Sequence, residues 1–196
     1  MKLAILLTLD SKSDKKVIFW KKKFKKIYSK LLFVDDVPHL TLIVTQVKFK
    51  KKGILELKKE IKKCNINFEL NILKNDTFNN DLINNGKTFF FKIKKNDKIK
   101  KIQIQVAKSI KKNFQLIKQK NTQFRSLEKQ NLINYGFPYV GRNWIPHISI
   151  CNVIDKNLNK KITKNFLTQK IRMKFKIKKC LICSVVKNKL KILKKI

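Results

Sequence analysis

Two pentapeptides decide how this sequence is interpreted: Pro38-His39-Leu40-Thr41-Leu42 and Pro146-His147-Ile148-Ser149-Ile150. They contain both histidines of the chain and two of its three prolines. Alternate residues of a β-strand point to opposite faces, so each pentapeptide would present an imidazole and a hydroxyl on one face and apolar side chains on the other. One pattern repeated around every histidine predicts two matching strands that contribute to a single functional site.

Two imidazoles that converge on one site are suited to in-line displacement at phosphorus. One of them, with a near-neutral pKa, removes a proton from the attacking hydroxyl or water, and the other protonates the leaving oxygen. The hydroxyls of Thr41 and Ser149 would hold the non-bridging phosphate oxygens as charge redistributes. This chemistry needs no metal and no cofactor.

Apolar periodicity on either side of the motifs alternates between strand and helix patterns. Strands are expected at residues 2–9, 39–47, 66–73, 88–94, 147–153, 173–177 and 189–196, and helices at 14–32, 54–64, 97–117, 126–135 and 158–171. The helix at 126–135 is expected to stop at Gly136. No change in composition marks a linker, so residues 1–196 are predicted to form one α+β or α/β domain with about eight strands.

The chain is strongly basic, with 49 Lys and Arg against 12 Asp and Glu and a net charge of +37. A basic surface attracts phosphate through counterion release, which favours a polyanionic partner. Abundant Lys, Ile and Asn beside scarce Ala, Gly and Arg are also expected from an AT-rich coding sequence, so both explanations of the charge stay open. With 43% apolar residues the chain can bury a core, which excludes wholesale disorder.

Four cysteines are too few for a disulfide scaffold in a chain of this length. Residues 175–186 (F-K-I-K-K-C-L-I-C-S-V-V) imply a strand on which Cys180 and Cys183, three residues apart, would face opposite sides. Buried thiols are therefore predicted rather than a metal or redox pair. No apolar run reaches membrane-spanning length, and residues 3–9 are favoured as a strand over a short signal peptide. We expect a reduced, cytoplasmic, monomeric protein without a membrane partner.

The two motifs resemble those of the 2H phosphoesterases, which include bacterial 2′-5′ RNA ligases and RNA 2′,3′-cyclic phosphodiesterases. That family carries two H-x-[ST]-x motifs on two pseudo-symmetric lobes, and here 108 residues (147 − 39) separate the histidines. The resemblance covers nearly the whole chain and implies His39, Thr41, His147 and Ser149 as the catalytic set, with His147 more often the base. It also implies an α+β fold of two lobes, each a small antiparallel sheet with helices outside, and an active-site cleft between them.

The activity that the resemblance implies is a metal-independent phosphodiesterase acting on RNA 2′,3′-cyclic phosphate ends or related nucleotides. The reverse reaction of the same acid–base site is 2′-5′ RNA ligation. Alternative substrates are 2′-5′ oligonucleotides, cyclic nucleotide signals and ADP-ribose cyclic phosphate. An alternative from another class is a basic RNA-binding module that holds phosphate without turning it over.

An aromatic loop at residues 135–144 precedes the second motif and is similar to loops in some members of that family. Its rings, Phe137, Tyr139 and Trp144, are candidates for stacking a nucleobase, and the alternative is that they close the hydrophobic core beneath the loop. Arg142 is a candidate phosphate ligand because the planar guanidinium makes bidentate contacts.

The chain departs from the family immediately before the second motif. Many RNA-processing members have an arginine directly beside that motif, whereas here Asn143, Trp144 and Ile145 precede Pro146. Lysines would have to supply the missing charge, and the sequence does not single out which ones.

Overall fold

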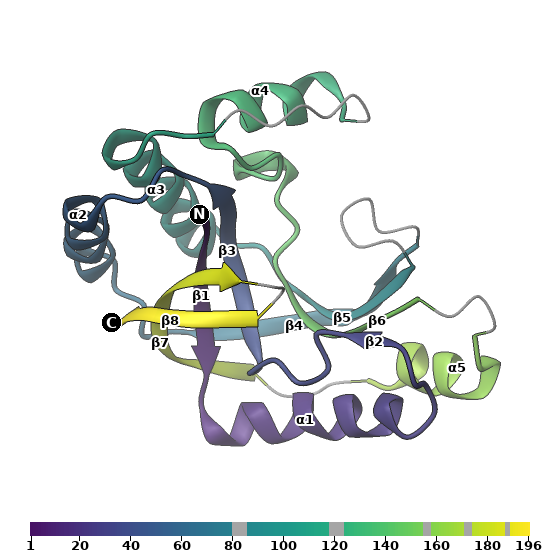
Figure 1. The fold of residues 1–196 in the computed structure, drawn as a ribbon. Helices are drawn as coiled ribbons and strands as arrows, with labels where there is room; N and C mark the ends of the chain where they lie inside the picture. Colours follow the sequence, from purple (N-terminus) through teal and green to yellow (C-terminus); the bar gives the residue numbers. More distant parts are fainter. Residues whose placement is uncertain (80–85, 118–123, 155–157, 171–173, 187–188) are drawn as a thin grey trace.

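The computed structural model describes residues 1–79, 86–117, 124–154, 158–170, 174–186 and 189–196 as alternating strands and helices (Figure 1). The strands are β1 (Lys2–Leu9), β2 (Leu31–Leu32), β3 (His39–Gln46), β4 (Glu69–Phe78), β5 (Lys87–Ile93), β6 (His147–Val153), β7 (Lys174–Val186) and β8 (Lys189–Lys195). The helices are α1 (Ser11–Lys25), α2 (Lys51–Lys63), α3 (Asp97–Asn113), α4 (Ser126–Tyr135) and α5 (Lys160–Thr168), with a 3-10 turn, η1 (Gly141–Asn143). The fold is α+β.

The strands form an eight-stranded antiparallel sheet in the order β1-β3-β6-β5-β4-β7-β8, with β2 paired to β6. Because β1 also pairs with β7, six of these strands make a closed circuit. The contact between β3 and β6 divides the sheet into two half-sheets. One contains β3, β1 and β7, and the other contains β6, β5 and β4. These two matching half-sheets agree with the expected two lobes, and the lobes are joined in one sheet.

Two short seams join the half-sheets. At one of them, β4 meets β7 at Glu69, Leu70 and Asn71. At the other, the β3–β6 seam, a single register pair places Leu40 opposite Ile148 in the described part of the chain, and both side chains are completely buried. The seam that carries the two histidine motifs therefore depends on apolar packing more than on a long ladder of hydrogen bonds.

The main hydrophobic core lies between one face of the sheet and the helices. Its aromatic centre joins α1, β5 and α5, with 4.6 Å between the ring centroids of Phe24 and Phe89 and 5.1 Å between those of Trp20 and Phe166. The opposite face carries a small apolar cluster of Ala4, Leu6, Leu181 and Cys183. The helices thus occupy one face of the sheet and leave the other for the polar residues of the motifs.

Two helices are shorter than the sequence pattern predicts. The helix expected over 14–32 ends at Lys25, because Leu31 and Leu32 pair with β6 as strand β2. The helix expected over 97–117 ends at Asn113, because Leu116 bridges to Val47 in extended backbone. In both places pairing with a distant part of the chain overrides local helical periodicity.

The remaining boundaries differ by a few residues or agree. The strand expected at 66–73 becomes the longer β4, and the strand implied by residues 175–186 lies within β7. Helix α4 has the predicted bounds, with Gly136 as its C-cap. Gly136 has φ 64°, and a Cβ there would lie 2.1 Å from the hydroxyl of Thr45, so the helix end requires glycine. Ile171 and Met173, expected in a helix and a strand, lie outside the described residues.

Within the ranges given above, no helix is both long and apolar enough to cross a membrane.

We predict that Ile148→Ala will lower the free energy of unfolding by about 2–5 kcal/mol, because it opens a cavity at the fully buried β3–β6 seam. Urea denaturation measures the change. Ile133→Ala is the control, since Ile133 is 79% exposed and its truncation should change stability by less than about 0.5 kcal/mol. Equal effects of the two substitutions would contradict the importance of the seam.

Candidate active site

The two histidine motifs face one another across the β3–β6 seam. Antiparallel pairing in the register of that seam directs His39 toward Ser149 and Thr41 toward His147. All four side chains are partly exposed, while the residues between them are buried. The sheet therefore brings the four predicted residues to one face, which we call the site face.

Each imidazole is held by the same bond to the backbone two residues earlier. Nδ1 of His39 lies 2.6 Å from the carbonyl oxygen of Val37, and Nδ1 of His147 lies 2.8 Å from that of Ile145. A carbonyl oxygen only accepts, so Nδ1 donates in both rings and Nε2 is the nitrogen that accepts a proton when the ring is neutral. Val37 and Ile145 each precede the proline of a motif, and a following proline favours extended backbone.

A buried lysine lies behind the first motif. Lys21 of α1 is 5% exposed, and its Nζ donates to the carbonyl oxygens of Phe33 and Asp36, the latter at 2.9 Å. The turn that it holds contains Phe33 in the left-handed region, with φ 65°, and leads directly to Val37. Burial lowers the pKa of Lys21 to about 8, so most of the ammonium stays charged at pH 7.

The environment of His39 favours its neutral form. Burial lowers the pKa of His39 below 6.5, and the charge of Lys21 lowers it too, while the hydrogen bond with Val37 and the charge of Asp36 act in the opposite direction. At neutral pH the ring is therefore ready to take a proton at Nε2.

Two phenylalanine rings pack against His147. Phe78 of β4 meets its imidazole edge to face and Phe90 of β5 meets it at a tilt, each with 5.1 Å between centroids. The two phenyl rings stack on each other at 4.1 Å. The sequence analysis did not identify either residue. Strand alternation along Phe89-Phe90-Phe91 could have indicated Phe90, because it places Phe90 on the opposite face from its two neighbours. In the structure those neighbours lie in the main core, and Phe90 lies opposite Ser149 in the strand register.

Lys92 brings a positive charge to the site face. It lies opposite His147 in the register of β5 and β6. Its Nζ is 3.7 Å from Asp76, which also pairs with Lys74 at 3.0 Å. Lys92 is therefore a candidate for the lysine that supplies positive charge beside the second motif, which the sequence did not single out.

The aromatic loop lies largely inside the protein. Phe137 and Trp144 are 9% and 3% exposed and belong to the main core. Tyr139 is partly buried, with its ring centroid 6.1 Å from that of Phe124 and 5.7 Å from that of Phe137. Their burial favours the alternative in which these rings close the core, whereas Arg142 is exposed.

The cysteines of the C-x-x-C segment lie on opposite faces of β7. Cys180 is in the main core and Cys183 is in the small cluster, as strand alternation predicts. Burial raises the pKa of Cys180 to about 12 and that of Cys183 to about 11, so both are thiols at neutral pH. Among the described residues, no three His, Cys, Asp or Glu side chains come together as a possible metal site.

Fold and site together define a class: two joined antiparallel half-sheets with an H-x-[ST] motif on each side of the seam. Solved structures with a similar fold include TT0787 of Thermus thermophilus, with a TM-score of 0.66 and 11% identity over 100% of this chain and 96% of that chain. Two structures of Escherichia coli LigT, one in apo form and one complexed with ATP, are also similar, with TM-scores of 0.60 and 0.59. Each has 12% identity over 99% of this chain and 95% of that chain.

A protein described as a phosphoesterase has a TM-score of 0.54 and 12% identity over 99% of this chain and 95% of that chain. No protein-family model matches the sequence, and no curated protein matches it. The similarity to these structures confirms, at the level of the fold, the resemblance noted in the sequence.

We predict that His39 titrates below pH 6.5 and that its pKa rises in Lys21→Met, because the substitution removes a nearby cation. Proton–carbon NMR measures this directly, since the chain has two histidines and a His39→Ala spectrum assigns the signals. Lys22→Met, on the exposed side of α1, should leave the titration unchanged. A His39 pKa that is the same with and without Lys21 would contradict the electrostatic role of this lysine.

Proposed function

We propose that the protein is a metal-independent phosphodiesterase of the 2H phosphoesterase type that opens 2′,3′-cyclic phosphates at RNA ends or in related nucleotides. The observation that carries the proposal is the β3–β6 seam, whose register directs two H-x-[ST] motifs toward each other on one face. The same Nδ1 bond in both rings supports matched roles for the two Nε2 atoms in proton transfer.

In the proposed reaction, one imidazole accepts a proton at Nε2 from a water molecule whose oxygen attacks phosphorus. A bond forms between that oxygen and phosphorus, and the bond from phosphorus to the 2′ or 3′ ribose oxygen breaks. The second imidazole, protonated at Nε2, gives its proton to the leaving oxygen. Thr41 and Ser149 donate to the non-bridging oxygens, where charge increases in the transition state.

The surroundings of His39 support its assignment as the base. A base must enter the reaction neutral, and both burial and Lys21 favour the neutral form of His39 by lowering its pKa. His147 then acts as the acid, with Lys92 beside it in the strand register. This order is the reverse of the one that the resemblance implies most often.

The substrate class follows from phosphodiester chemistry and charge. The similar structures include one described as a phosphoesterase and one of LigT with ATP, which supports a phosphate-bearing nucleotide ligand for this chain as well. The net charge of +37 favours RNA over a small neutral ligand. The protein is proposed to act as a single domain and a monomer in the cytoplasm.

We predict that His39→Ala and His147→Ala each reduce kcat/KM by about 10²–10⁴-fold, the usual contribution of a general acid or base. The substrate is a short RNA with a 2′,3′-cyclic phosphate end, incubated in EDTA, and chromatography identifies which monoester forms. Circular dichroism of both variants should match that of the wild type. Rates close to wild type in either variant would refute the two-histidine mechanism.

A substrate with an activated leaving group distinguishes the histidine that acts as the base from the one that acts as the acid. A nitrophenyl phosphodiester has a leaving group that needs no proton, so His147→Ala should lose much less activity on it than His39→Ala. The opposite order would assign the base to His147. Binding of RNA without any product from the wild type would instead favour a phosphate-binding module.

We predict that Lys92→Gln lowers kcat/KM for the cyclic phosphate by about 10-fold or more, because a charge-assisted contact to phosphate is lost. Lys74→Gln is the matched control: Lys74 pairs with the same Asp76 and lies one strand farther from His147. Steady-state kinetics at two salt concentrations measures the difference. Equal losses in the two variants would show that only the general charge of the face matters.

A further inference from the structure

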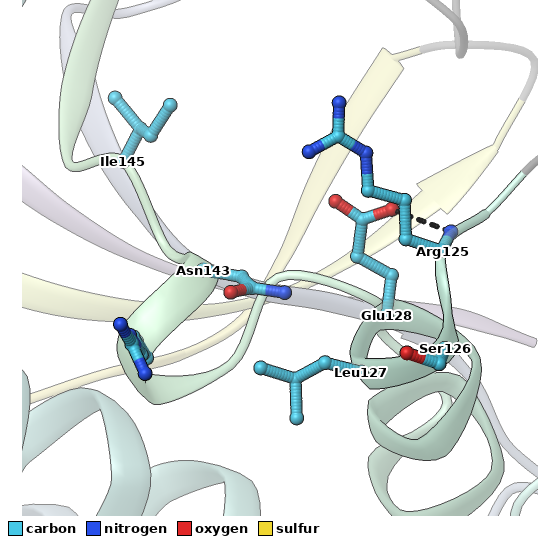
Figure 2. A pocket seen from close by; sticks show the side chains of 7 residues that line it. Arg125, Ser126, Leu127, Glu128, Asn143 and Ile145 are labelled. Atoms are coloured by element: carbon cyan, nitrogen blue, oxygen red, sulfur yellow. Dashed lines mark hydrogen bonds between the residues drawn. The ribbon is translucent and has the colours of Figure 1, made fainter.

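A pocket of about 420 Å³ lies between the start of α4 and the turn η1, next to the second motif. It is lined by Arg125, Glu128, Arg142, Asn143 and Ile145, together with Ser126 and Leu127. Figure 2 shows Asn143 and Ile145 across from Arg125 and Glu128, which lie side by side. Its volume is in the range of small-molecule sites, and two of the three arginines of the chain line it.

Hydrogen bonds from neighbouring side chains fix the backbone around the pocket. Lys95 donates to the carbonyl oxygens of Gly141 and Arg142 at 3.1 and 2.8 Å, and the Gly141 N–H donates to Gln103 at 3.0 Å. The amide of Asn131 on α4 donates to the carbonyl of Val140 at 3.2 Å. These hydrogen bonds hold the helix and the turn together, so the backbone that carries the side chains of the pocket is fixed.

The charges of the pocket suit a phosphodiester with its ribose. Within the described residues, neither Arg125 nor Arg142 makes an ion pair, so both guanidinium groups can bind an oxyanion. Glu128 accepts the backbone N–H of Arg125 at 3.0 Å, and its carboxylate can also accept from a hydroxyl. Two cations and one acceptor fit a phosphate flanked by a sugar better than a free inorganic anion.

The pocket is connected to the histidines through Ile145. The side chain of this residue lines the pocket, and its carbonyl oxygen accepts the Nδ1 bond of His147. The backbone from Arg142 to His147 therefore runs directly from the pocket to the reacting centre. A strand whose end lay at the histidines would extend along this backbone into the pocket.

We propose that the Arg125–Arg142 pocket binds an internal phosphodiester of an RNA strand whose cyclic phosphate end lies at the two histidines. This inference rests on the proposed phosphodiesterase function and makes the protein selective for strands over mononucleotides. It assigns a role to Arg125, which the sequence pattern did not single out, and narrows the role of Arg142 to contact with the strand.

The test compares a mononucleoside 2′,3′-cyclic phosphate with a tetranucleotide that has the same cyclic end. The tetranucleotide-to-mononucleotide ratio of kcat/KM should fall about 10-fold in Arg125→Gln and in Arg142→Gln, because each removes a charge-assisted contact. Lys129→Gln removes one positive charge from an exposed position of the same helix and should leave the ratio unchanged. An unchanged ratio in both arginine variants, or an equal fall in the lysine variant, would overturn the proposal.

A binding measurement keeps this test independent of turnover. Fluorescence anisotropy follows a tetranucleotide with a 3′-phosphate end, and each arginine variant should bind it more weakly, with the slope of log K against log salt reduced by about 0.7. If the wild type turns over neither substrate but the arginine variants still bind the strand more weakly, the proposed catalysis fails and the strand site stands. Wild-type binding by both variants would overturn the strand site even if catalysis is found.

Discussion

Leu40 and Ile148 lie opposite one another where the two half-sheets meet, and the geometry of the site depends on this contact. A shift of one residue in either strand would turn its histidine and hydroxyl toward the main core and its apolar side chains toward the site face. Full burial of both residues makes such a shift costly, because two large apolar side chains would then face water. Hydrophobic burial at the seam thus fixes the relative position of the two histidine motifs.

The chemistry of the imidazoles is set by the backbone next to them. In each motif the carbonyl oxygen of the residue before the proline accepts a hydrogen bond from Nδ1. The backbone around a buried proline at the start of the strand therefore determines the tautomer of the ring. The two sites then differ in their neighbours: His39 has the ammonium of Lys21 behind it, whereas His147 has two phenyl rings and Lys92. These unlike surroundings, combined with matched geometry, agree with the opposite roles that we propose for the two histidines.

Strand alternation around His39 and His147 was enough to predict that four polar residues share a face. Periodicity along the chain left α+β and α/β folds open, and the α+β fold of two lobes came from the resemblance to the 2H phosphoesterases. Helix ends were less predictable: Leu31 and Leu116 lie in predicted helices, but Leu31 pairs with β6 and Leu116 bridges to Val47, just beyond β3. Lys92 could not be singled out among so many lysines, because only the strand register places it opposite His147. Phe78 reaches His147 through β4, a contact between residues far apart in the sequence that no local pattern contains.

The closed order of strands has a consequence for how the protein is made. Strand β1 is synthesised well before β7, yet it lies between β3 and β7 in the sheet, and β7 begins only at Lys174. The half-sheet that carries His39 is therefore incomplete on the ribosome until Lys174 and the residues after it emerge. Pairings between such distant segments form slowly, so the nascent protein must keep an apolar strand edge from aggregating for most of its synthesis.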